Sequence, residues 1–197
     1  MKVLGMIRLG VVLALYAAAA CVALAFVYAG TSVIIAERAE ADLQIALKEV
    51  FPDADSFEPL GEIRSPDTTV IIQSAFKAIK NGELAGAALQ VSRGSYGGPI
   101  VTLTGVSIEG IITGVRIIEH TETPGLGANA ASPSFFVDRP NRITFYGQFS
   151  GKSTNDPFEV KNDVVAISAS TVTSQAVTAS VRAAGIAVIN WLAEGGS

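Results

Sequence analysis

The stretch IVTLTGVSIEGIITGVRIIE, residues 100–119, decides the fold of this chain. Two runs rich in β-branched residues flank Glu109 and Gly110, and this pattern predicts two antiparallel strands joined by a tight turn. Earlier in the chain, Asn81 and Gly82 separate two further strand-like runs, and this dipeptide suits a type I′ turn. The sequence therefore predicts an antiparallel sheet built from hairpins.

Helices are expected on both sides of these hairpins. Apolar residues recur at helical spacing in residues 36–50, and Pro52 ends that pattern. An Ala- and Val-rich run at residues 175–191 predicts a C-terminal helix. Shorter elements are expected between them: a helix within residues 129–137 and strands at residues 158–161 and 164–167. The order of these elements predicts an α+β domain with a largely antiparallel sheet and flanking helices.

A long segment without charged residues, residues 9–36, precedes the hairpins. It exceeds the roughly 20 apolar residues that a membrane-spanning helix needs. The overall composition agrees, with 49% hydrophobic residues and a mean hydropathy of +0.43. A cleaved signal peptide has a shorter apolar core, and a lipoprotein anchored at Cys21 would be polar beyond that residue. We therefore expect a retained single transmembrane helix.

The charges around this segment indicate its orientation. Lys2 and Arg8 lie before it and acidic residues follow it, so the positive-inside rule keeps the N-terminus in the cytoplasm. The expected organisation has three parts: a cytoplasmic start and transmembrane helix at residues 1–36, a juxtamembrane helix and linker at residues 37–66, and an outer ligand-binding domain at residues 67–197.

The inventory of reactive residues excludes several classes of site from the outer domain. Cys21 is the only cysteine and lies within the predicted span, so no disulfide, thiol nucleophile, attached haem or cysteine-ligated cluster is expected outside it. His120 is the only histidine, and no metal site or catalytic side chain is predicted. A net charge of −4 with scattered basic residues gives no nucleic-acid footprint.

Three loops rich in glycine or hydroxyl residues each follow a predicted strand: residues 93–99, 120–127 and 168–174. Loops carried on a rigid sheet commonly form binding sites. In the second loop, Pro124 and Gly125 fit the central positions of a type II turn. The third loop, SASTVTS, opens the C-terminal helix. Its hydroxyl residues fit either ordinary helix caps or a site where free N–H groups bind a phosphate.

Together these loops resemble the signature of the G subunit of the Rnf electron-transport complex. The resemblance is carried by YGGPI at residues 96–100, HTETPGLG at residues 120–127 and the pattern Ser168-x-x-Thr171-x-Thr173-Ser174. The related C subunit of the sodium-pumping NADH:quinone reductase shares the last motif and part of the second. The resemblance covers residues 90–192, and the N-terminal anchor agrees with it.

The resemblance implies an FMN-binding domain in which FMN is attached covalently, through a phosphoester bond, to Thr171. Its phosphate would lie at the N-terminus of a helix that begins near Thr173, and its ring would face residues 120–127. The implied cofactor-binding residues are Ser168, Ala169, Ser170, Thr171 and Thr173 in the third loop, Glu122, Thr123, Gly125, Leu126 and Gly127 in the second, and Gly97 and Gly98 in the first.

Three positions depart from the family motif. Ala169 replaces the usual glycine, Ser170 replaces the usual alanine, and Val165 stands where the motif has an aspartate, with Asp163 two residues away. In the family a dedicated flavin transferase reads this region, so the departures bear on the attachment at Thr171. Ala169 also bears on the backbone, because a positive φ disfavours a residue with a Cβ atom.

Two further residues of the loops have two interpretations each. Tyr96 fits either packing within the domain or stacking on the flavin ring. Glu122 fits either a hydrogen bond with His120 that fixes the turn or a role in redox or proton chemistry.

The function implied by the resemblance is an electron-carrying subunit of an ion-translocating complex of the ferredoxin:NAD type. The subunit would span a bacterial inner membrane once, with its soluble domain on the periplasmic or outer side. Its partners would be the other membrane subunits of the complex and, during maturation, the flavin transferase. The alternatives are a non-redox assembly or scaffold subunit with a degenerate flavin site, a flavoprotein like the C subunit of the quinone reductase, and an enzyme that binds FMN without a covalent bond.

Overall fold

The computed structural model describes residues 2–196 and shows an α+β chain with two compact units, which divide between Gln44 and Ile45. Most of the first helix, α1 (Lys2–Val50), makes up the first unit. The helix is long and apolar enough to cross a membrane, and none of its most apolar window is buried by the described residues. The helix predicted at residues 36–50 is the continuation of this same helix.

The second unit is built on a five-stranded antiparallel sheet with its strands in sequence order. The strands are β1 (Ser56–Leu60), β2 (Val70–Lys80), β3 (Glu83–Gly94), β4 (Pro99–Ser107) and β5 (Ile112–Glu119). Both predicted hairpins, β2–β3 and β4–β5, are confirmed. The β2–β3 turn has positive φ at Asn81 and Gly82, 53° and 81°, as a type I′ turn requires.

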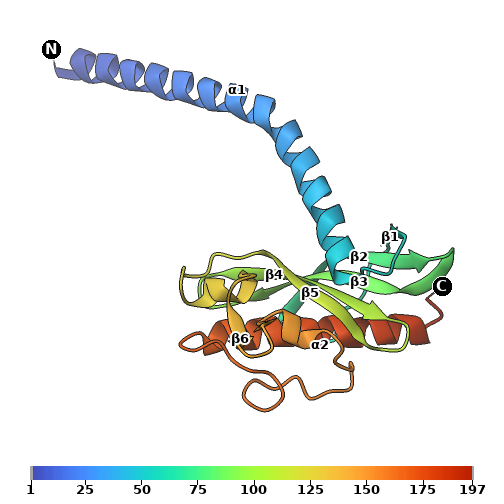
Figure 1. Ribbon diagram of the computed structural model, residues 1–197. Coiled ribbons are helices and arrows are strands. Elements are labelled where there is room, and N and C mark those ends of the chain that lie inside the picture. The colour runs from blue at the N-terminus through green and yellow to red at the C-terminus, as the bar shows by residue number, and fades with distance from the viewer. Residues whose placement is uncertain (1, 197) are drawn as a thin grey trace. The chain divides into compact units, whose positions relative to one another are not determined.

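The C-terminal helix α2 (Thr171–Ala193) packs along one face of the sheet, mainly against β3 and β4 (Figure 1). Val177, Val181 and Val188 are fully buried against the sheet. Each contributes about 1.5–3 kcal/mol of hydrophobic stabilisation on burial. The largest buried rings, Phe145 and Phe149, close the same core from the segment that follows β5 and meet edge to face. These buried side chains hold α2 at a fixed position on the sheet.

The other face of the sheet receives the last turn of α1, residues 45–50. Thr113 on β5 donates a hydrogen bond of 2.6 Å to the carbonyl oxygen of Val50, which has no helical partner at this end. A Cβ atom on Gly105 would lie 2.6 Å from that oxygen, and one on Gly114 would lie 2.8 Å from the Val50 Cα. The two glycines therefore allow the backbone of this turn to lie directly on β4 and β5.

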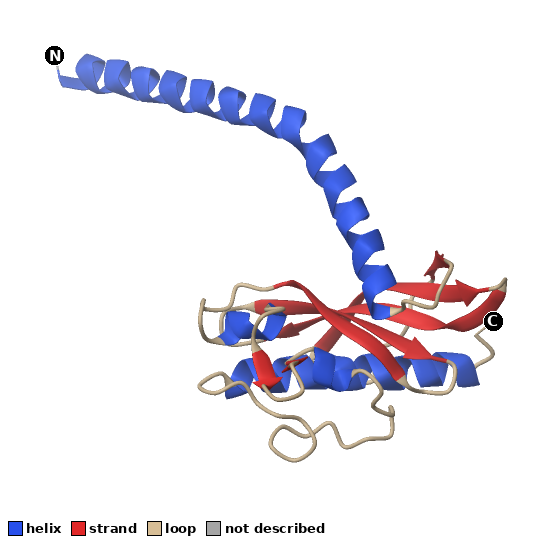
Figure 2. Cartoon of the chain, viewed as in Figure 1, coloured by secondary structure: helices blue, strands red, loops and turns tan. Residues whose placement is uncertain are grey.

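Between β5 and α2 the chain is mostly irregular (Figure 2). The short elements there are the 3-10 helices η1 (Gly127–Ala131) and η2 (Gly147–Phe149) and the paired strands β6 (Phe136–Asp138) and β7 (Ile143–Thr144). The helix predicted within residues 129–137 is therefore only partly found: η1 begins at Gly127, and β6 takes the end of that range.

The two strands predicted at residues 158–161 and 164–167 were wrong. Phe158 and Lys161 have positive φ, 51° and 75°, which a strand cannot include. Asp163 folds this segment into a turn instead, because its carboxylate accepts hydrogen bonds from the N–H groups of Phe158 and Glu159. Lys152 completes the turn with an ion pair to Asp163 at 3.1 Å.

Candidate functional site

A cleft of about 450 Å³ opens where the three predicted loops meet. Antiparallel pairing brings the first two loops together. The start of β4 lies beside the end of β5, with Val101 opposite Glu119, so the loop before β4 and the loop after β5 lie at the same edge of the sheet. The N-terminus of α2 lies at the same place. The cleft is lined by Tyr96, Glu122, Thr123, Leu126, Gly127, Ala169, Ser170, Thr171, Val172 and Thr173.

Four of the predicted residues do not line the cleft. Ser168 lines a neighbouring cavity of about 560 Å³ together with Val165. Gly125 has a φ of 78° in the turn where the Leu126 N–H donates to the Thr123 carbonyl oxygen at 3.1 Å, as expected for a type II turn. The other two are Gly97 and Gly98.

Gly97 and Gly98 allow the first loop to pack closely on the second loop. A Cβ atom on Gly97 would lie 2.5 Å from the carbonyl oxygen of Thr121, and one on Gly98 would lie 2.5 Å from the Thr121 hydroxyl. That hydroxyl donates a hydrogen bond of 2.9 Å to the carbonyl oxygen of Gly97. The two glycines therefore allow the close approach of Thr121 from the second loop.

The first turn of α2 presents free hydrogen-bond donors to the cleft. The helix begins at Thr171, two residues before the predicted start. The first helical bond runs from the Ser174 N–H to the Ser170 carbonyl oxygen at 3.0 Å, and Ser170 provides no side-chain cap. Within residues 2–196, the N–H groups of Thr171, Val172 and Thr173 therefore have no partner. Such a helix start attracts anions.

The Ser174 hydroxyl, in the third loop, already has two hydrogen-bond partners within the chain. It donates to the Ser170 carbonyl oxygen at 2.9 Å and accepts from the Ile167 N–H at 3.0 Å. These bonds fix the approach of the chain to α2 and leave the first-turn donors free.

Ala169 occupies the left-handed region with a φ of 61°. This conformation costs about 1–2 kcal/mol for a residue that carries a Cβ atom. Ala169 turns the chain into α2 directly before Ser170 and Thr171. The position where the family motif has glycine is therefore one where the backbone favours glycine.

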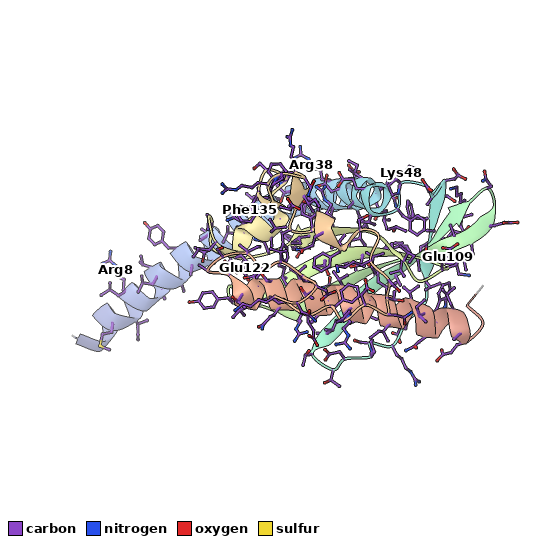
Figure 3. All side chains as sticks on the ribbon, turned by 60° about the horizontal axis from the view of Figure 1, so that its bottom comes forward. Arg8, Arg38, Lys48, Glu109, Glu122 and Phe135 are labelled. Atoms are coloured by element: carbon purple, nitrogen blue, oxygen red, sulfur yellow. The ribbon has the colours of Figure 1, made fainter. Side chains whose placement is uncertain are left out.

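Glu122 connects the three loops. Its side chain is only 7% exposed, and its carboxylate accepts hydrogen bonds from the Thr173 hydroxyl at 2.9 Å and from the Gly97 N–H at 3.2 Å. The carboxylate lies so close to Gly127 that a Cβ atom there would collide with it. Gly127 therefore makes room for the contact between Glu122 and α2. The interpretation in which Glu122 hydrogen-bonds His120 does not hold, because its bonds go to Gly97 and Thr173. Figure 3 shows Glu122 at the N-terminal end of α2.

These surroundings also determine the charge of Glu122. Burial favours the neutral form, but hydrogen bonding outweighs burial and holds the pKa of Glu122 below its ordinary value of 4.5. The contributing groups are the Ser95 hydroxyl, the Gly97 N–H, the Thr173 hydroxyl and the charge of His120. The Ser95 hydroxyl is buried near the carboxylate without full hydrogen-bond geometry. Glu122 is therefore ionised at neutral pH.

Tyr96 and Val172 also line the cleft, although the sequence gave no firm signal for either. Tyr96 is 80% exposed, so it does not pack in the core, and it forms an open wall of the cleft. Val172 lies between two threonines in the first turn of α2. Its side chain is 51% exposed and faces the cleft, which the apolar residue type alone does not indicate. With Leu126 these side chains supply apolar surface to the same cleft as the free N–H groups. The arrangement fits a ligand with an anionic group and a flat ring.

Comparison with known proteins agrees with this chemistry. The model of the FMN-binding domain family matches residues 95–185, which include every residue that lines the cleft. The model of the RnfG N-terminal region matches residues 1–50, the length of α1.

Individual relatives extend over most of the chain. The G subunit of the Na(+)-translocating ferredoxin:NAD(+) oxidoreductase complex of Acetobacterium woodii is 32% identical over 88% of this chain and 87% of its own length. The G subunit of the ion-translocating oxidoreductase complex of Methanosarcina acetivorans is 32% identical over 71% of each chain. The crystal structure of Shewanella oneidensis NqrC aligns with 74% of each chain, at 19% identity and a TM-score of 0.49. From the family models and the two relatives, the chain belongs to the RnfG family of Rnf-type ion-translocating complexes, membrane-associated electron-transfer flavoproteins with an FMN-binding domain.

Proposed function

We propose that this cleft holds FMN and that Thr171 carries it through a phosphoester bond between its hydroxyl oxygen and the FMN phosphorus. The observation that carries the proposal is the position of Thr171. It is the first residue of α2, it lines the cleft, and it carries one of the three adjacent N–H groups that have no partner among residues 2–196. A phosphate attached there would gain about 0.3–1 kcal/mol from the helix terminus, and more where it is shielded from water.

The other lining residues suit the rest of the cofactor. Tyr96, Leu126 and Val172 offer apolar contacts for the ring, and the Thr173 hydroxyl and Glu122 fix the loops around it. Bound FMN supplies the capacity to accept and return electrons. The chain orients the cofactor and shields it from water on the side closed by the three loops.

In the membrane, we expect this protein to act as an electron carrier among the other subunits of an Rnf-type complex. Its relatives include a component of a Na(+)-translocating ferredoxin:NAD(+) oxidoreductase complex, so a complex with that type of donor and acceptor is the best-supported setting. The charges around α1 favour the periplasmic or outer side for the flavin domain, where a flavin transferase would act on Thr171 during maturation.

Acid precipitation of the protein purified from its native membrane tests the covalent bond. The proposal expects yellow colour in the pellet and an FMN mass adduct on the peptide that contains Thr171. Thr171→Ala should remove the adduct, whereas Thr171→Ser keeps a hydroxyl at the same place and should retain it. An adduct that survives in Thr171→Ala would contradict the assignment.

The same test separates the alternatives. Flavin released into the supernatant would indicate non-covalent binding, and a colourless protein that still co-purifies with its partners would indicate a scaffold subunit. Ala169 gives the scaffold alternative its physical basis, because the left-handed backbone there is strained in this chain. Ala169→Gly restores the family residue and should increase the fraction of flavinylated protein if that strain limits attachment.

A further inference from the structure

Glu122 is a buried negative charge in the wall of the cleft. Its carboxylate is held from two sides, by the Gly97 N–H at 3.2 Å and by the Thr173 hydroxyl at 2.9 Å. Both donors are neutral groups. Gly127 lies against the same carboxylate, and its lack of a Cβ atom leaves the space in which Glu122 reaches Thr173.

In the described part of the chain, no cation neutralises this carboxylate directly. The ion pairs among residues 2–196 involve four other carboxylates, those of Asp53, Asp67, Glu49 and Asp163. His120 is exposed and makes no ion pair with Glu122. In residues 2–196 the charge is therefore fixed by two neutral donors, shielded from water by burial, and has no cation within ion-pair distance.

We propose that Glu122 is a positioning residue that also sets the reduction potential of the FMN, its fixed negative charge holding the potential at a more negative value. This inference rests on the proposed function, because it requires FMN in the cleft that Glu122 lines. Full reduction of the ring at neutral pH adds two electrons from the reductant and one proton from water, and thus leaves one additional negative charge on the flavin. A buried carboxylate in the wall of the same cleft opposes that charge more strongly than an exposed carboxylate does.

The structure offers a matched control for this charge. Glu109 lies in the turn between β4 and β5, at the opposite end of that hairpin from Glu122 (Figure 3). It belongs to neither the cleft nor its supporting contacts. Glu109→Gln and Glu122→Gln remove the same net charge, so any difference between them comes from position.

The test is a dye-mediated reductive titration of the FMN-loaded, full-length protein with dithionite, followed by flavin absorbance at pH 8. Glu122→Gln should move the midpoint potential to a less negative value, while Glu109→Gln should leave it unchanged. Glutamine keeps an oxygen for the Gly97 N–H and an amide for the Thr173 hydroxyl, so the loops stay connected. An unchanged potential in FMN-loaded Glu122→Gln would overturn the inference and leave Glu122 a purely structural residue.

A second variant decides the matter if Glu122→Gln does not hold FMN. Thr173→Val keeps the volume at this position and removes the hydroxyl that partly offsets the carboxylate charge. The potential of this variant should move in the opposite direction, to a more negative value. A potential that stays constant or becomes less negative would overturn the inference. Absence of FMN from the wild-type protein would instead refute the proposed function.

Discussion

At the scale of single residues, Ala169 is the position where backbone strain and the cofactor site coincide. Its φ of 61° lies in the region that glycine occupies without a steric cost. Ala169→Gly should therefore increase the free energy of unfolding by about 1 kcal/mol, because the relief of strain exceeds the added flexibility of the unfolded chain. Urea unfolding followed by circular dichroism measures the change.

The control for this prediction is Ala166→Gly, three residues earlier in the same loop and without a positive φ. There the substitution only adds freedom to the unfolded chain, and it should lower the free energy of unfolding by about 0.4–1 kcal/mol. Equal effects of the two substitutions would show that the conformation of Ala169 has no energetic cost.

Glu122 makes the free energy of unfolding of the domain depend on pH in the acid range. Its pKa is lower in the folded protein than the ordinary 4.5, so its stabilising contribution is complete above pH 4.5 and is lost as the pH falls through the folded value. Glu122→Gln should lower the free energy of unfolding at pH 7 by about 1–2 kcal/mol, on the scale of hydrogen bonds to a charged group. The difference from wild type should shrink below pH 4.5. Urea titrations at pH 7, 4 and 3 measure it, and a difference that stays constant would contradict the role of the charge.

Much of the site was predictable because it consists of short continuous segments. Neighbouring residues of HTETPGLG and SASTVTS remain neighbours in any fold. Once these loops were identified in the sequence, most of the residues that line the cleft were identified too. The direction of each side chain depends on contacts from distant parts of the chain. Ser168 points to a different cavity, and Gly98 packs on Thr121, for reasons that no local pattern contains.

At the scale of secondary-structure elements, the contact between the last turn of α1 and the sheet depends on glycine. Gly114→Ala would place a methyl group 2.8 Å from the Val50 Cα, where only backbone movement can relieve the contact. We expect a loss of about 1–3 kcal/mol of stability from this overpacking. Thermal unfolding of the full-length protein in detergent measures it.

Gly61→Ala provides the comparison for this substitution, because nothing lies within 4 Å of a Cβ atom there and its φ is not positive. It should leave the melting temperature unchanged or slightly higher. A similar response of Gly61→Ala and Gly114→Ala would remove the packing explanation.

The elements themselves were predictable to different degrees. The hairpins were found because β-branched runs and an Asn-Gly turn act locally. The segment of residues 158–167 was misread, since its apolar residues fill the core from a turn held by Asp163. A single half-buried carboxylate that accepts hydrogen bonds from backbone N–H groups leaves no periodic pattern in a sequence.

At the scale of the whole molecule, the high hydrophobic content of 49% has two separate sources. The exposed apolar side chains of α1 face outward, whereas those of α2 are largely buried within the domain. This contrast supports one membrane-spanning segment, with α2 as a core helix of the domain.

The sole cysteine allows a test of the proposed topology. Cys21 is exposed on α1 and should lie within the bilayer, so a membrane-impermeant maleimide should label it only after the membrane is dissolved in denaturing detergent. In a Cys21→Ser background, Ser134→Cys on an exposed loop of the domain should react in intact cells whose outer membrane is permeabilised. Labelling of Ser134→Cys only after lysis would place the domain in the cytoplasm.

Because the three loops lie far apart in the sequence, the cleft forms late in the synthesis and folding of the chain. The cleft needs residues near both ends of the span from Tyr96 to Thr173, and α2 leaves the ribosome after all the strands that carry the other two loops. Contacts between such distant segments form late, after the hairpins and the anchor. A flavin could therefore be attached at Thr171 only after the span from Tyr96 through the first turn of α2 has been made: a chain that stops before residue 171 lacks the helix start that would receive the phosphate.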